Sequence, residues 1–348
     1  MIAASRSVQT TTTEPRPGAL GRLVEWSRRR PTESLLFAAC IGVIAYFFGF
    51  YRVFSKGQLS AAHWASQAWN AENNQEHSWL VLPITFGLLW YHRERLRRSQ
   101  SKPWNAGLAL VAAGVACFVL AARAVQPRIA IIGLPLIALG MIGYLWGRQT
   151  ARVALFPCAF LLFMVPIGGF VQGTVSLQIL VSTVCNSLAS FIGMKIAASG
   201  TTIHSLDGSF NFEIAEGCSG IRSLMAMTML TALYIHFTQR EWWKKGVIFA
   251  GSLVFAVIGN IGRIFTVILF AKFVSPRIAG GIYHDYSAFV FFPFAVLSMV
   301  GFARFVNLDW HTMIKSPERP APPPAAPAVD PAATATENKA PNPVSYDY

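Results

Sequence analysis

Long apolar stretches, most of them close to twenty residues, alternate with short polar segments along most of the chain. A membrane-spanning helix needs about 20 mainly apolar residues. Windows of that kind lie at 34–54, 78–92, 104–122, 129–147, 153–170, 219–237, 246–272 and 287–306. The pattern therefore predicts an all-α polytopic membrane protein with about eight transmembrane helices.

The stretch 173–194 is long enough to span a membrane but has a polar side. Its polar residues are Ser176, Gln178, Ser182, Thr183, Asn186, Ser187 and Ser190. We interpret it as one amphipathic helix, lying in the interface or packed inside the bundle. Counting it as a ninth span would place the basic segment 239–245 outside, against the positive-inside rule.

The segments 201–206 and 209–214 alternate between apolar and polar residues, with Asp207 and Gly208 between them. An Asp-Gly pair between alternating segments is typical of a β-hairpin with a two-residue turn. The predicted topology places this small hairpin on the extracytoplasmic side, directly before Cys218. A plain connecting loop is the alternative.

The chain has 29 Lys and Arg but 16 Asp and Glu, a net charge of +13. In a soluble protein this excess would suggest nucleic acid as a partner, but 53% of the residues are hydrophobic and only 13% are charged. The basic residues cluster in short segments such as 27–30, 91–102 and 239–245. We therefore expect both termini in the cytoplasm and no nucleic-acid partner.

Three regions are expected. Residues 1–33 form a cytoplasmic N-terminal segment, which we expect to be retained because the first apolar run is itself long enough to span. Residues 34–306 form the transmembrane domain. Residues 307–348 are rich in Pro and Ala and poor in large apolar residues, which predicts a disordered cytoplasmic tail.

The five cysteines show no CxxC pair and no zinc-site spacing, so neither a metal nor a cofactor is expected. They are Cys40, Cys117, Cys158, Cys185 and Cys218. The first four are interpreted as small packing residues. Cys218 is different, because backbone N–H groups at the start of the helix 219–237 would lower the pKa of its thiol. It is either a buried small residue or a nucleophile.

Two further residues are expected at the same membrane face. Arg263 stands inside an apolar helix, where a charge is costly and indicates function, although it could instead reach the outer headgroups. His284, beside Asp285, precedes the last span and could act as a proton carrier or be a plain interfacial histidine. Arg222, one turn beyond Cys218, could hold a substrate carboxylate or pair with a nearby acidic residue. The acidic residues with which Arg222 could pair are Glu213 and Glu216.

Three blocks in order, "EGCSGIRSL", "NIGRI" and "YHDYSAF", resemble the exosortase/archaeosortase family of multipass membrane cysteine transpeptidases. The blocks "EHSWLVLPITFGLLWYHR" (76–93) and "FLLFMVPIG" (160–168) agree, so the similarity covers roughly residues 30–306. Two positions depart from the family: Gly217, where alanine is frequent, and Ser78, where glycine is common. The resemblance implies a catalytic triad of Cys218, Arg263 and His284. The supporting or substrate-binding residues are then Glu216, Ser219, Gly220, Arg222, Asn260 and Asp285.

The resemblance also implies an activity in a bacterial inner membrane. Family members cleave exported proteins at a C-terminal sorting signal of the PEP-CTERM type, made of a short motif, a membrane helix and a basic cluster. Cys218 would form a thioester, His284 would move the proton and Arg263 would stabilise the oxyanion or the thiolate. An amine, another envelope or polysaccharide acceptor, or water would then resolve the acyl-enzyme. The alternatives from other classes are a transporter or lipid-linked sugar carrier, and a structural membrane subunit.

Overall fold

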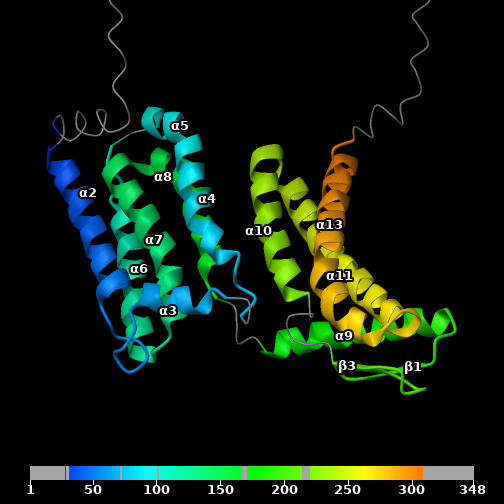
Figure 1. Cartoon of the computed structure of the whole chain (residues 1–348). Helices are drawn as coiled ribbons and strands as arrows, with labels where there is room; N and C mark the ends of the chain where they lie inside the picture. Colours follow the sequence, from blue (N-terminus) through cyan, green and yellow to red (C-terminus); the bar gives the residue numbers. More distant parts are fainter. Residues whose placement is uncertain are drawn as a thin grey trace, which may run out of the picture. The chain divides into compact units, whose positions relative to one another are not determined.

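The computed structural model describes residues 28, 31–70, 73–99, 102–166, 171–213 and 220–308, and they are mainly helical (Figure 1). The helices in chain order are α2 (Pro31–Ile44), η1 (Ala45–Phe50), α3 (Ala61–Ala68), α4 (Ser78–Tyr91), α5 (Arg93–Arg98), α6 (Ala106–Ala124), α7 (Pro127–Trp146), α8 (Arg148–Phe160), η2 (Leu161–Met164), α9 (Val171–Phe191), α10 (Ile221–Thr238), α11 (Trp242–Phe273), α12 (Pro276–Ile278), η4 (Ala279–Tyr283) and α13 (His284–Val306). The strands are β1 (Ile196–Ser199), β2 (Thr202–Ser205) and β3 (Asn211–Glu213).

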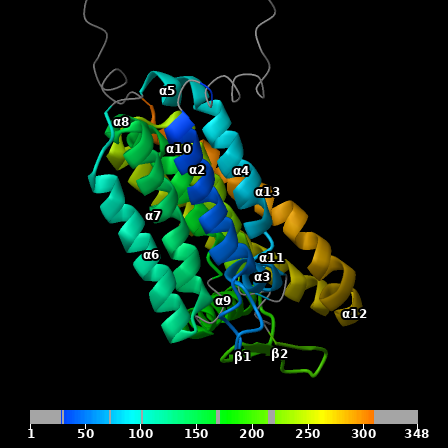
Figure 2. The ribbon, with the colours of Figure 1, turned by 90° about the vertical axis from the view of Figure 1, so that its left-hand side faces the viewer.

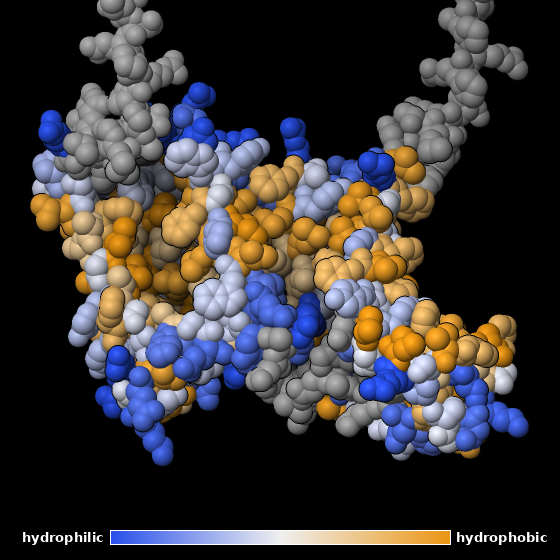
Figure 3. All heavy atoms as spheres, viewed as in Figure 1, coloured by the Kyte–Doolittle hydropathy of each residue, from blue (hydrophilic) through white to orange (hydrophobic). Residues whose placement is uncertain are grey.

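A helix lies at each of the eight predicted spans, but the helices differ in length. Within the described part of the chain, four are long and apolar enough to cross a membrane: α6, α7, α11 and the part Tyr286–Val306 of α13. Helix α4 has 14 residues, or about 21 Å at 1.5 Å per residue, which is shorter than the hydrocarbon core of a bilayer. The chain is thus a membrane protein, while the count of eight spans stays a prediction. Figure 3 shows apolar surface along the middle of the helices and polar surface at their ends.

Helices α6 and α7 lie side by side (Figure 1 and Figure 2) and are in close backbone contact. A Cβ atom added to Gly107 would stand 2.6 Å from the Gly140 carbonyl oxygen, and one on Gly114 would stand 2.7 Å from that of Gly133. Glycines seven residues apart fall on the same face after about two turns. Small residues therefore let these two backbones approach, as is common for membrane helices.

A second core joins α4, α8, η2 and α10. Val81 of α4 and Phe160 of α8 are buried there together with Met229 of α10. Where these helices end, His92 and His236 meet with their Nε2 atoms 3.1 Å apart. This packing holds the last turns of α10 next to the end of α4.

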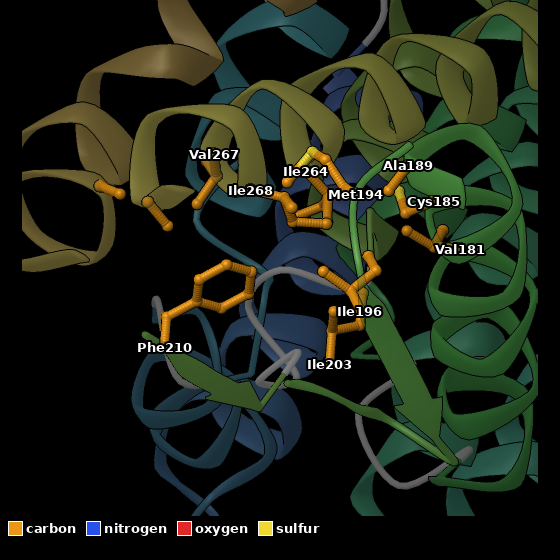
Figure 4. Packing of buried hydrophobic residues seen from close by; sticks show 12 residues of the cluster. Val181, Cys185, Ala189, Met194, Ile196, Ile203, Phe210, Ile264, Val267 and Ile268 are labelled. Atoms are coloured by element: carbon orange, nitrogen blue, oxygen red, sulfur yellow. The ribbon is translucent and has the colours of Figure 1, made fainter. Parts of the chain in front are cut away.

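Helix α9 packs against α11, and Figure 1 shows it running across that helix rather than along it. The sheet β1–β2–β3 covers the other side of this contact. Ile196, Ile203 and Phe210 from the sheet region share one buried cluster with Ile264 and Ile268 of α11 (Figure 4). The apolar positions of the alternating segments therefore face the helices.

The sheet differs from the predicted hairpin in two respects. Strands β2 and β3 are antiparallel as expected for these segments, but β1 pairs with the free side of β2 and makes a third strand. The prediction of a two-residue turn is wrong. A hydrogen bond of 3.0 Å from the Ser205 N–H to the Phe210 carbonyl closes a four-residue loop, 206–209. The Asp207 carboxylate favours this wider loop because it accepts bonds from the Ser205 hydroxyl and the Ser209 N–H.

The chain divides into two compact units, Met1–Ala303 and Arg304–Tyr348. The second is described only as far as residue 308. The predicted disordered tail, 307–348, and the N-terminal segment, 1–33, therefore lie almost entirely outside the described residues.

Candidate functional site

Arg263 is buried on α11, where only 9% of its surface is exposed. Its Nε donates to the Ser287 hydroxyl at 3.0 Å, and its Nη2 donates to the His284 carbonyl at 3.1 Å. The same Nη2 lies 3.4 Å from the His284 Nε2. The structure therefore brings together two of the predicted site residues from different helices, and a buried cation receives the partners that it needs.

The Arg263–His284 contact places a cation beside the imidazole. A guanidinium group has only donors, so a hydrogen bond between these two side chains requires the His284 Nε2 to accept. Ser287 strengthens the geometry, because its hydroxyl donates to the His284 carbonyl at 2.8 Å.

Gly220 brings the start of α10 against α11. Its φ of +84° lies in the left-handed region, and a Cβ at this position would stand 2.8 Å from Cγ of Asn260. Glycine is therefore required both by the backbone conformation and by the close approach. Asn260 is 4% exposed and lies one turn before Arg263 on α11, so Gly220 lies close to the arginine.

A small cavity lies between α10, α11 and α13 beside this cluster. Its lining includes Ser223, Asn260, Arg263 and Phe291, and its volume is about 10 Å³. A volume of that size is at the lower limit for one water molecule. The described side chains thus leave little free space beside Arg263 between these three helices.

Several predicted residues cannot be placed. Glu216, Cys218 and Ser219 lie outside the described residues, and so does the side chain of Asp285. Of the other cysteines, Cys158 and Cys185 are buried, as expected for packing residues. Two were predicted to be buried but are only half-buried: Cys40 and Cys117.

Arg222 points to a partner that the sequence did not suggest. Its Nε lies 3.2 Å from Oε2 of Glu76, the residue two positions before α4. Both side chains are nearly half exposed, so the pair contributes at most about 1 kcal/mol. Burial lowers the pKa of the neighbouring His77, which favours its neutral form. Arg222 thus links α10 to the segment before α4.

The blocks 76–93 and 160–168 are joined by a buried hydroxyl. Ser78, which is fully buried, has one hydroxyl proton, shared between the Phe163 carbonyl at 3.2 Å and the Gln75 Oε1 at 3.1 Å. The Trp69 indole N–H also donates to the Met164 carbonyl, at 2.9 Å. These two blocks therefore support the start of α4, and through Glu76 they support the start of α10.

One comparison with known proteins identifies a family. The family model described as transmembrane exosortase matches residues 69–301, more than half of the chain. The chain belongs to the transmembrane exosortase family. The matched range of this exosortase includes all three predicted triad residues and the Glu76–Arg222 pair. Searches of curated proteins and of solved structures found no match.

Sequence reasoning missed two residues that the exosortase structure places at the site. Ser287 lies one turn after His284, a spacing at which helical residues share a face, and this signal could have found it. Glu76 could not be found in this way, because it lies far from Arg222 in sequence. Among the described residues of this exosortase, no group of three His, Cys, Asp or Glu side chains is arranged to hold a metal ion.

Proposed function

We propose that this exosortase is a membrane cysteine transpeptidase that cleaves C-terminal sorting signals of the PEP-CTERM type. The observation that carries the proposal is the contact between the buried Arg263 and His284, the first residue of α13. A cation held by two helices and an imidazole beside it are the groups that a cysteine nucleophile requires.

The chain itself links Cys218 to this pair. Cys218 precedes Gly220 by two residues, and two residues of chain span at most about 7 Å. Gly220 contacts Asn260, one turn from Arg263. This covalent limit supports Cys218 as the nucleophile.

In the proposed reaction, the Cys218 sulfur attacks the scissile carbonyl of the substrate. The His284 Nε2 takes the thiol proton, for which the thiol replaces Arg263 as its hydrogen-bond partner, and then gives it to the leaving amine as the C–N bond breaks. Arg263 stabilises the thiolate and the oxyanion, because a fixed cation in a water-poor site acts strongly. The thioester is then resolved by an acceptor amine, another envelope nucleophile or water.

The proposal includes a place and partners. The chain would lie in a bacterial inner membrane with both termini in the cytoplasm, so that Arg263, His284 and the sheet face outward. Its substrates would be exported proteins that carry a motif, a membrane helix and a basic cluster. A polysaccharide or another envelope component would be the acceptor.

The decisive experiment traps the thioester. The full chain in membranes is incubated with a substrate that carries such a sorting signal, and mass spectrometry identifies the fragment bound to Cys218. Cys218→Ala should abolish both the adduct and processing, while Cys117→Ala, a matched change at a half-buried cysteine, should leave both intact. Equal processing by Cys218→Ala would contradict the proposal and favour a carrier or scaffold.

A further inference from the structure

An apolar cleft of about 620 Å³ lies between α2, η1, α6 and α7. Helix α2 lies beside α6 and α7 in Figure 1. Unlike those two helices, α2 makes no glycine contact: a Cβ added to Gly42 would meet nothing within 4 Å. Helix α2 therefore lacks the close glycine packing that joins α6 and α7.

Aromatic contacts hold α2 and η1 on either side of this cleft. Phe37 meets Trp146 of α7 with ring centroids 5.3 Å apart, and Phe48 meets Phe118 of α6 at 5.1 Å. The lining between these contacts includes small residues of α2, namely Ala39 and Cys40. The cleft thus follows from large side chains at its ends and small ones in its middle.

Apolar side chains of the cleft are open to the surroundings of the protein. The exposed fractions are 48% for Leu36, 55% for Val43 and 48% for Val115. Inside a bilayer such a space is filled by hydrocarbon, because an empty cleft would lose the contacts of every atom that lines it. Such a space therefore suits a lipid acyl chain.

Two polar residues indicate the kind of lipid. Arg123, in the last turn of α6, lines the cleft together with Tyr51, which follows η1. Arg123 is exposed and makes no ion pair within the described part of the chain. A cation beside a tyrosine near a helix end suits the phosphate of a lipid headgroup at the membrane surface.

We infer that this cleft binds one anionic phospholipid. An acyl chain lies between α2 and the α6–α7 pair, and the phosphate lies on Arg123. The site is separate from Arg263 and His284, so the inference does not depend on the proposed activity.

Native mass spectrometry of the full chain tests this inference. The protein in detergent is incubated with equal amounts of phosphatidylglycerol and phosphatidylcholine that carry the same acyl chains. The wild-type chain should retain one lipid and prefer phosphatidylglycerol about fivefold, the effect expected of a single basic residue near a membrane surface. Arg123→Gln should reduce this ratio to about one, while Arg277→Gln, at an exposed cation on α12, should leave it unchanged.

A pair of tryptophan substitutions tests the place of the acyl chain. Val115→Trp fills the cleft and should abolish retention of either lipid. Leu120→Trp, on the same helix but outside the cleft and 57% exposed, should retain it. Retention by Val115→Trp at the wild-type level, or equal retention of both lipids by the wild type, would overturn the inference. Thermal unfolding checks that each variant is folded, and if Val115→Trp is not, the ratio for Arg123→Gln decides.

Discussion

The helix pairs α6–α7 and α11–α13 both meet at small residues, but the groups that are buried between the two helices differ. In α6–α7, Gly107 and Gly140 bring backbone against backbone. In α11–α13, a Cβ added to Gly259 would stand 3.3 Å from the Cβ of Ala295, and one turn further on α11 Arg263 is buried against α13. The first pair needs only small side chains at the right spacing. The second pair also needs polar partners, because a buried cation without them is costly.

The largest expected effect is a loss of activity, and it concerns the α11–α13 pair. Arg263→Gln removes the cation from α11–α13, and processing of a sorting-signal substrate should fall by about 10²–10³-fold, the usual effect of removing a stabiliser of an oxyanion. Rates are measured with the full chain in membranes.

Arg263→Lys is the matched control for charge. It keeps the cation but not the planar fork that reaches both Ser287 and His284, so activity should recover only in part. If Arg263→Gln kept full activity, the buried cation would not be needed for the reaction, and this difference between the two helix pairs would have no chemical role.

The next effect concerns stability and belongs to α6–α7. Gly140→Val places carbon 2.6 Å from the Gly107 carbonyl oxygen and 2.8 Å from the Val111 nitrogen, and it should lower the free energy of unfolding by about 1–3 kcal/mol. Thermal unfolding in detergent measures this change. Gly42→Val, where a Cβ meets nothing within 4 Å, should have little effect; equal losses for the two variants would show that helix propensity and not close packing is responsible.

A smaller effect tests whether Ser287 positions the arginine. Ser287→Ala leaves the buried Nε of Arg263 without this acceptor, and the rate should fall by about tenfold, because such a loss costs roughly 1–3 kcal/mol. Ser287→Thr, which keeps the hydroxyl, should restore much of the rate. Ser252→Ala is the control, since that buried hydroxyl bonds only to the Phe249 carbonyl among the described contacts; a similar loss of rate there would indicate a general effect on α11.

The smallest expected effect is a pH dependence of the loop between β2 and β3, where Asp207 pairs with Lys272 near the end of α11. An ion pair with Lys272 and bonds from Ser205 and Ser209 hold the pKa of Asp207 well below its usual range. A carboxyl group with a lowered pKa stabilises the folded state above about pH 4, and this contribution is lost as the pH falls toward the folded pKa. The protection factors of the β2 and β3 amides, which are their exchange rates relative to the intrinsic rate at the same pH, should therefore fall below pH 4. Asp207→Asn should show low protection factors already at pH 7, and an unchanged pH profile of the protection factors in this variant would assign the effect to another group.

Much of the fold could be predicted because the apolar patterns are local. Helices formed at all eight predicted apolar stretches, and the alternating segments formed β2 and β3. Strand β1 could not be predicted, because its short sequence Ile196–Ser199 becomes a strand only by pairing with β2. The loop between β2 and β3 also depends on a side chain, since the Asp207 carboxylate accepts bonds that a two-residue turn would not provide.

The site was predictable in part for a similar reason. Arg263 was conspicuous because a charge inside an apolar helix is unusual, and its contact with His284 agrees with their expected common face. The pairing of Arg222 with Glu76 was not predictable, because the two residues come from α10 and from the segment before α4. Cys218 stays a prediction, since it lies outside the described residues.

By itself the sequence determined that this chain is a helical membrane protein of the exosortase family, because apolar length and ordered motifs are properties of the chain alone. Only the tertiary structure decided which groups meet: Arg263 with Ser287 and His284, and Gly220 with Asn260. The physical reason is that hydrogen bonds and close packing act over a few ångströms, so they depend on how the helices pack and not on the order of residues along the chain.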